Sequence, residues 1–160
     1  MGFIPNAFES DDGFSASLVP FIAPFTGVAS GIPITVLAID APFDPDVYAH
    51  VAGASAVTIL QDGRYRITYA GCGQNAPGPR SSVAWFLALD TGAGFVPVAG
   101  TLGETFHFGG TIGVGQAADF LETNLVAGDR VELQAILLSG GPNVTPTLLA
   151  CKLGIVQVDV

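Results

Sequence analysis

Two stretches of the sequence alternate hydrophobic and polar residues with the period of a β-strand. In residues 64–69, Tyr65, Ile67 and Tyr69 fall on one face, and arginine and threonine fall on the other. Residues 130–138 alternate in the same way. Strict alternation over a short run is typical of a strand with one buried face. We therefore predict strands over both ranges.

A third stretch, residues 82–90, is hydrophobic on both faces. One face would carry Val83, Trp85, Leu87 and Leu89, and the other would carry Ala84, Phe86 and Ala88. An antiparallel strand normally exposes one face to solvent. We therefore expect the second face of this strand to be covered, either by a neighbouring subunit or by a segment of the chain that wraps over it.

Shorter strand-like runs complete the pattern, and segments rich in glycine and proline separate them. They lie at residues 32–39, 47–52, 56–60, 95–98, 105–109, 121–124 and 147–158. Residues 73–80 are expected to form a loop, and residues 116–122 are the one stretch that could form a helical turn. About eight to ten short strands without a convincing helix predict an all-β, antiparallel sandwich of two sheets.

The first 31 residues differ in composition from the rest. Five of the chain's eleven phenylalanines lie there among Pro, Gly, Ser and Ala, without a helical or strand period: Phe3, Phe8, Phe14, Phe21 and Phe25. The segment either folds back over its own domain or forms an extended arm that docks these aromatics on another protein. We favour the second interpretation, which divides the chain into an arm (1–31) and one domain (32–160).

The composition excludes several partners. Only 12% of the residues are charged, 49% are hydrophobic, and the formal net charge is −9. Nucleic-acid binding requires clustered Lys and Arg, so we expect no nucleic-acid partner. The uncharged stretch 13–39 is interrupted by Pro and Gly and is not predicted to cross a membrane. Residues 1–12 have neither the basic block nor the apolar block of a cleaved secretory signal.

Residues suited to catalysis or metal binding are scarce. His50 and His107 are isolated, and two cysteines, Cys72 and Cys151, are too few and too far apart for a zinc or redox motif. We therefore predict no catalytic residue, no metal site and no cofactor. An enzyme that uses Cys72 as nucleophile with one of the histidines is the least favoured interpretation.

One acidic segment could bind calcium. Carboxylate oxygens suited to Ca²⁺ are offered by Asp40, Asp44 and Asp46. Pro42 and Pro45 lie between them, and a stiff, solvated loop is the alternative that we prefer.

Three elements together resemble a known protein family. They are the run GRYRITY at 63–69, the run NLVAGDRVEL at 124–133, and Leu-Gly-Ile at 153–155. Over residues 32–160 the chain resembles the trimeric jelly-roll domains of the complement-subcomponent and tumour-necrosis-factor superfamily, in the style of bacterial and phage heads of collagen-like spore-surface glycoproteins. Gly128 and Asp129 carry the most specific element, where they turn the chain. A collagen stalk and the aromatic residue usual before the last glycine are missing.

The resemblance implies a jelly-roll topology, a homotrimer and no catalysis. It also implies that the strand of residues 65–69 lies antiparallel beside the C-terminal strand. Cys72 ends the first strand and Cys151 begins the second, so we expect their Cα atoms within or nearly within disulfide-bonding distance. In a cytosol the two thiols would remain reduced.

The composition also favours a trimer. A sandwich of 16.3 kDa with so few charges lacks the polar residues to cover its surface alone, and obligate interfaces bury such surplus apolar area. Our candidates for the trimer interface are Tyr65, Tyr69, Trp85, Phe86, Leu153 and Ile155. The alternative is that all six belong to the core of the sandwich.

These patterns predict a non-enzymatic structural protein. The preferred hypothesis is a homotrimer on the virion surface that decorates or cements a viral (phage) capsid. Its partners would be its own copies and the major capsid protein or another virion protein, reached through the N-terminal arm. The alternative is a receptor- or carbohydrate-binding head of a phage fibre or of a cell- or spore-surface protein.

Overall fold

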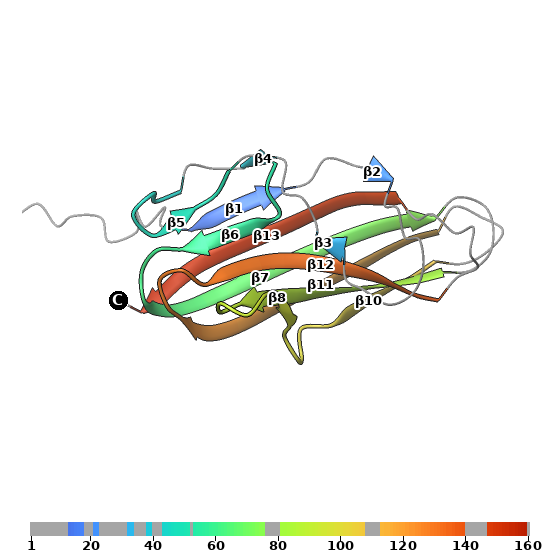
Figure 1. The fold of residues 1–160 in the computed structure, drawn as a ribbon. Coiled ribbons are helices and arrows are strands. Elements are labelled where there is room, and N and C mark those ends of the chain that lie inside the picture. The colour runs from blue at the N-terminus through green and yellow to red at the C-terminus, as the bar shows by residue number, and fades with distance from the viewer. Residues whose placement is uncertain are drawn as a thin grey trace, which may run out of the picture.

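The structure of residues 1–160 is a computed structural model. It describes residues 13–17, 21–22, 32–33, 38–39, 43–51, 53–75, 81–107, 113–139 and 147–159. Thirteen strands within these ranges form two antiparallel sheets, whose long strands run along a common axis (Figure 1). The described ranges contain no helix, and so no helix long and apolar enough to cross a membrane.

The first sheet, sheet A, has the strand order β11-β7-β13-β1-β4, with β2 also paired to β13. Its strands are β1 (Phe14–Ser17), β2 (Phe21–Ile22), β4 (Ala38–Ile39), β7 (Gly63–Asn75), β11 (Gly113–Leu125) and β13 (Thr147–Asp159). Every pairing in the sheet is antiparallel.

The second sheet, sheet B, has the order β10-β8-β12-β6-β5, with β3 beside β12 and β9 beside β8. Its strands are β3 (Ile32–Pro33), β5 (Tyr48–Ala49), β6 (Ala56–Ile59), β8 (Ser81–Asp90), β9 (Val96–Pro97), β10 (Gly103–His107) and β12 (Arg130–Ser139). In each sheet a C-terminal strand lies between an early strand and a middle strand. This interleaving is the jelly-roll arrangement, and it confirms the predicted fold class.

The core lies between the two sheets, where the alternation of the sequence placed it. Tyr65, Ile67 and Tyr69 of β7 are buried there, and so are Val131 and Leu133 of β12. The intervening residues of β7 are exposed. Both stretches form strands, as predicted. β7 has one buried face, whereas β12 is buried on both faces, because Glu132 and Gln134 also have almost no exposed surface.

The centre of the outer face of sheet B, which points away from sheet A, is also buried. Ala84, Phe86 and Ala88 have almost no exposed surface, and neither do Glu132 and Gln134 on the neighbouring strand. The chain covers this face by itself, which is one of the two arrangements expected for residues 82–90.

A carboxylate is buried on this face together with its hydrogen-bond donors. Glu132 accepts hydrogen bonds from Ser55 Oγ at 3.1 Å and from Gln134 Nε2. A buried polar group without partners would cost free energy, and these two donors reduce that cost.

Trp85 links the two sheets through the backbone of Gly71. A Cβ atom built on Gly71 would lie 2.5 Å from Cδ2 and from Cε3 of the indole, so only glycine fits at this position. The indole Nε1 donates to Thr105 Oγ1 at 3.1 Å, and that hydroxyl donates to the carbonyl of Val83 at 3.2 Å. The side chain of Trp85 therefore fixes β8 against β7 and ties it to β10.

The turn between β11 and β12 forms where the sequence motif placed it. Gly128 has a φ of +100°, a conformation that other residues rarely adopt. Asp129 accepts the backbone N–H of Val126 through Oδ2 at 2.9 Å. Asp62, in the turn between β6 and β7, accepts the N–H of Ala127 at 2.8 Å. This hydrogen bond joins that turn to the turn between β11 and β12.

Two local predictions were wrong. Residues 116–122, the stretch that could form a helical turn, lie inside β11, because this segment pairs with β7 at every position. Residues 73–75, expected to begin a loop, instead continue β7. In both cases pairing with a neighbouring strand outweighs local preference. Residues 76–80 lie outside the described residues.

The N-terminal segment contributes strands to sheet A. β1 and β2 lie within the predicted arm, and they pair with β13 through Phe14 opposite Ile155 and Phe21 opposite Leu148. The boundary predicted at residue 31 therefore does not mark where strands begin. The other three phenylalanines of the arm, Phe3, Phe8 and Phe25, lie outside the described residues, as do the side chains of Phe14 and Phe21.

Gly71→Ala should destabilise the protein by about 1–3 kcal/mol, because the added methyl overlaps the indole of Trp85. The measurement is the free energy of unfolding in urea. Ala70→Ser is the matched control, since it adds one heavy atom at the adjacent exposed position of the same strand. Equal stability of the Gly71→Ala variant and the wild type would contradict the close contact.

Candidate interaction surface

The six residues proposed for the trimer interface are buried within the single chain. Five belong to the core cluster and Phe86 lies on the covered outer face of sheet B: Tyr65, Tyr69, Trp85, Leu153, Ile155 and Phe86. This corrects the assignment, because a side chain enclosed by its own sandwich has no surface left for another copy. The alternative interpretation, membership of the core, describes where the structure places five of them.

The outer face of sheet A, which points away from sheet B, exposes large hydrophobic side chains. Phe120 on β11 pairs with Thr68 on β7, and Val156 on β13 pairs with Arg66. Phe120 is 60% exposed and Val156 is 44% exposed. Apolar side chains gathered on one face are typical of a protein–protein contact surface.

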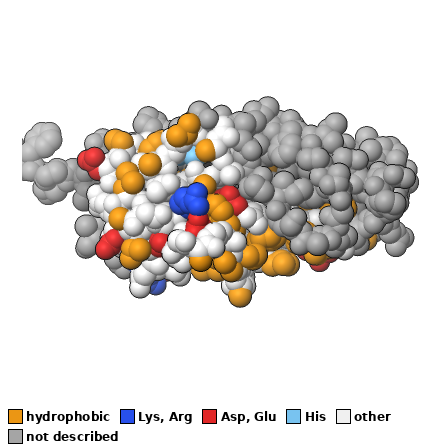
Figure 2. Space-filling view, viewed as in Figure 1, with side chains coloured by type: hydrophobic (Ala, Val, Ile, Leu, Met, Phe, Trp, Pro, Cys, Tyr) orange, Lys and Arg blue, Asp and Glu red, His pale blue; other side chains and the backbone are white. Residues whose placement is uncertain are grey.

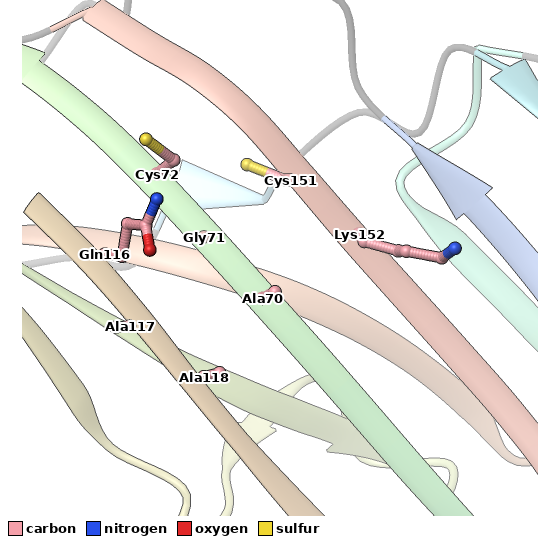
Figure 3. Close-up of a pocket in the computed structure, with 8 residues that line it drawn as sticks. All are labelled: Ala70, Gly71, Cys72, Gln116, Ala117, Ala118, Cys151 and Lys152. Carbon is pink, nitrogen blue, oxygen red and sulfur yellow. The ribbon is translucent and has the colours of Figure 1, made fainter.

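A groove continues this surface along the same three strands (Figure 3). It has a volume of about 530 Å³ and is lined by Ala70, Gly71, Cys72, Gln116, Ala117, Ala118, Cys151 and Lys152. Small side chains from β7 and β11 form its floor, and Lys152 on β13 stands at its edge. The lining is mostly apolar, so an apolar side chain suits the groove better than water does.

Charged residues lie beside Val156 on the same face, because Arg66 pairs with Glu122 on one side and with Val156 on the other. Glu122 Oε2 accepts from Arg64 Nη2 at 2.8 Å, and Glu122 Oε1 accepts from Arg66 Nε at 2.7 Å. The hydrogen bond from Arg66 is the main cause that holds the pKa of Glu122 below its usual value, and the charges of both arginines add to it. The outer face of sheet A thus carries an ion-pair cluster next to Val156, and Phe120 lies between this cluster and the groove.

The two cysteines occupy adjacent positions on neighbouring strands. Cys151 pairs with Gly71, and Cys72 pairs with Ala150. Both are free thiols. Cys151 belongs to the core, whereas Cys72 is half-buried, because successive residues of a strand point to opposite faces. Burial is the main cause that raises the pKa of Cys151 to about 12, and the nearby Cys72 raises it further. At neutral pH the thiol of Cys151 therefore stays protonated.

Two of the remaining polar candidates, His50 and Asp44, lie beside β5 of sheet B and apart from this surface. His50 is half-buried, with Nδ1 3.0 Å from the carbonyl oxygen of Ala56. Asp44 accepts the backbone N–H of Asp46 at 2.8 Å within a turn. Asp40 and the side chain of His107 lie outside the described residues. Among the side chains that are described, no three His, Cys, Asp or Glu are placed to hold a metal ion.

The sequence does not identify Phe120 as a surface residue. Aromatic residues in strands are normally assigned to the core, and the stretch around Phe120 does not alternate regularly. Only its register with Thr68, an exposed residue of β7, places Phe120 on the outer face.

Comparison with solved structures identifies the fold. No protein-family model and no curated protein matches the sequence. A structure of Eiger, a tumour necrosis factor from S. frugiperda, aligns with a TM-score of 0.60 at 13% identity, covering 92% of this chain and 93% of that one. The globular domain of the zebrafish complement 1qA protein aligns with a TM-score of 0.57 at 16% identity, covering 93% and 98%. The chain therefore has the jelly-roll fold that the sequence resemblance predicted.

Glu122→Gln should lower stability in a pH-dependent way. Because the folded protein depresses the pKa of this carboxyl below 4.5, the stabilisation is present above that pH and is lost as the pH falls through the folded pKa. The difference in unfolding free energy between wild type and variant should therefore shrink as the pH is lowered from 7 to 3. High salt should reduce the difference at pH 7. A difference independent of pH would contradict the ion pairs.

Proposed function

We propose that this protein is a non-enzymatic structural protein whose jelly rolls assemble as a homotrimer and decorate or cement the surface of a viral capsid. The observation that carries the proposal is the outer face of sheet A, which exposes Phe120 and Val156 and contains the groove, with Phe120 two residues along β11 from Ala118 in the groove lining. The likeness of the fold to tumour necrosis factor and complement 1qA supports the trimer, since the family that the sequence resembles is trimeric.

The small number of charged residues supports self-association. With 12% charged residues, the chain has little polar surface to keep an apolar face soluble. The chain itself already covers the centre of the outer face of sheet B at Ala84, Phe86 and Ala88, whereas the outer face of sheet A exposes Phe120 and Val156. Fully burying a side chain such as Phe120 contributes roughly 1.5–3 kcal/mol, and an obligate interface buries several of this kind.

The N-terminal residues before β1 provide the proposed anchor. Phe3 and Phe8 precede β1 in the sequence, so they can dock on the major capsid protein or another virion protein while β1 stays in sheet A. Three copies in one trimer would multiply weak docking by raising the effective concentration of the second and third arms. A rigid sandwich held in this way suits a role in reinforcing a shell.

Phe120→Asp should convert trimers to monomers without unfolding the chain. The substitution places a charge in each proposed interface, and the position is exposed in the single chain, so the fold should remain intact. Size-exclusion chromatography with light scattering measures the mass, and far-ultraviolet circular dichroism checks the strands. Val51→Asp is the matched control, because Val51 is exposed on the loop between β5 and β6. Trimers of unchanged stability in Phe120→Asp would contradict the assignment of this face.

Antibodies raised against the purified protein should label the capsid of virus particles from a culture that carries the gene. Immunogold electron microscopy is the measurement, and antibody pre-absorbed with the protein is the control. Label at tail tips would instead assign a receptor-binding head of a fibre. Label confined to cells or spores would assign a surface head, and either result would contradict the capsid proposal.

A further inference from the structure

We propose that three turns at one end of the sandwich form a second docking surface, besides the N-terminal arm, for the virion protein that is the proposed partner. The turns are residues 44–47, 60–62 and 126–129, called here the three-turn surface. The partner surface that fits it has an apolar centre bordered by lysine or arginine. The inference rests on the proposed function and adds the chemistry of the partner.

Hydrogen bonds join the three turns to one another. The N–H of Leu60 donates to the carbonyl of Val47 at 2.8 Å, which joins the second turn to the first. The N–H of Ala127 donates to Asp62 Oδ1 at 2.8 Å, which joins the third turn to the second. A surface that is ordered before it binds loses little conformational entropy when it docks.

Two large hydrophobic side chains are exposed on the three-turn surface. Leu60 in the second turn is 39% exposed, and Val126 in the third turn is 54% exposed. The two turns are adjacent, because the N–H of Gly128 donates to the carbonyl of Ile59 at 2.9 Å. Removing apolar area of this kind from water stabilises a complex, so these two side chains provide the apolar centre of the contact.

The charged residues within the three turns are all acidic. Asp44 and Asp46 lie in the first turn and Asp62 lies in the second, and the three turns contain no lysine or arginine. Figure 2 shows acidic and hydrophobic side chains next to one another at this end of the molecule. Because opposite charges attract and like charges repel, the three-turn surface favours a basic partner over an acidic one.

The neighbouring arginines do not neutralise this surface. Arg64 follows the second turn and forms an ion pair with Glu122 at 2.8 Å, and Arg130 follows the third turn and forms an ion pair with Asp90. The guanidinium of Arg130 also lies 5.0 Å from the centre of the Phe95 ring. Each arginine is therefore held by a carboxylate outside the three turns, and the three-turn surface stays negatively charged.

The chain enters the sandwich beside this surface. A Cβ atom built on Gly13, which immediately precedes β1, would lie 3.1 Å from Cγ2 of Val156. The next residue of β13, Gln157, donates through Nε2 to the carbonyl of Asp62 at 3.3 Å. β1 therefore begins at the end of the sandwich where β13 ends and β7 begins (Figure 1).

An anchored arm would bring the three-turn surface to the same partner. Residues 1–12 contain Phe3 and Phe8, the proposed anchor, and they join β1 beside the three-turn surface. The same residues carry Glu9, Asp11 and Asp12 and no lysine or arginine. The arm and the three-turn surface thus share one chemistry, hydrophobic side chains among carboxylates, and a partner that is both apolar and basic suits both.

Retention of variants on virus particles tests the docking surface. Viruses are prepared whose gene encodes each variant, and the copies that remain on washed particles are counted relative to the major capsid protein by quantitative mass spectrometry. Val126→Asp places a charge in the apolar centre and should reduce the retained copies by about tenfold or more. Val51→Asp is the matched control, because Val51 is an exposed valine outside the three turns, and its retention should equal that of the wild type.

A second variant tests the charge of the surface. Asp46→Lys places a lysine opposite the basic residues of the partner and should also reduce retention by about tenfold. Val51→Lys adds a lysine outside the three turns and should have no effect. Circular dichroism and light scattering of all the purified variants should match the wild type, because the substituted side chains are exposed.

Photo-cross-linking identifies what the three-turn surface touches. The photoreactive residue benzoylphenylalanine at position 126 should cross-link, in assembled particles, to a protein other than this chain, at a peptide that contains lysine or arginine. The same photoreactive residue at position 51 should give no such product.

The outcomes separate this inference from the proposed function. Particles that retain Val126→Asp and Asp46→Lys as well as the wild type would overturn the docking surface and leave the capsid role standing. Cross-links from position 126 that reach only copies of this chain, or only nucleic acid, would also overturn it. Particles that contain no wild-type protein would overturn both the capsid role and the docking surface.

Discussion

The contact between the indole of Trp85 and the backbone of Gly71 fixes how the two sheets lie on each other. Because the ring occupies the space that a Cβ atom at Gly71 would need, β7 and β8 approach at one defined level. Tyr69 adds a second link, since its hydroxyl donates to the carbonyl of Thr101 at 2.7 Å. Because β8 pairs with β10, fixing β8 against β7 also fixes the position of β10 at the edge of sheet B.

The residues around this contact also shape the outer face of sheet A. The strand that receives the indole carries small residues at the neighbouring positions, and on the outer face of sheet A these leave the groove. The core and the centre of the outer face of sheet B are buried by the chain itself. Phe120 and Val156 on the outer face of sheet A stay exposed. Because only 12% of the residues are charged, the chain has few polar side chains with which to cover them.

Much of the fold could be predicted from the sequence, because alternation is a local property. The faces of β7, β8 and β12 follow from which residues share a period, and the turn at Gly128 follows from its chemistry. The strand β11 could not be predicted in full, since its pairing with β7 overrides a composition that also suits a helical turn. The strands β1 and β2 were not predicted for a related reason. Their pairing with β13 is a long-range contact that residues 14–22 do not encode locally.

The candidate surface was harder to predict than the fold. Alternation groups residues by face but does not say which face is inside, so Tyr65 and Tyr69 were assigned to an interface although they form the core. Phe120 and Phe106 are the reverse case, because aromatic strand residues are expected inside and only the registers place them outside. Burial is decided by the packing of the two sheets, which no single segment contains.

If further copies of the same chain cover the exposed face of sheet A, the protein is a trimer in solution. The most direct test is the mass of the unmodified protein at micromolar concentration, measured by sedimentation equilibrium. We expect a single species of three times the chain mass of 16.3 kDa. A single species of 16.3 kDa over the whole concentration range would contradict it.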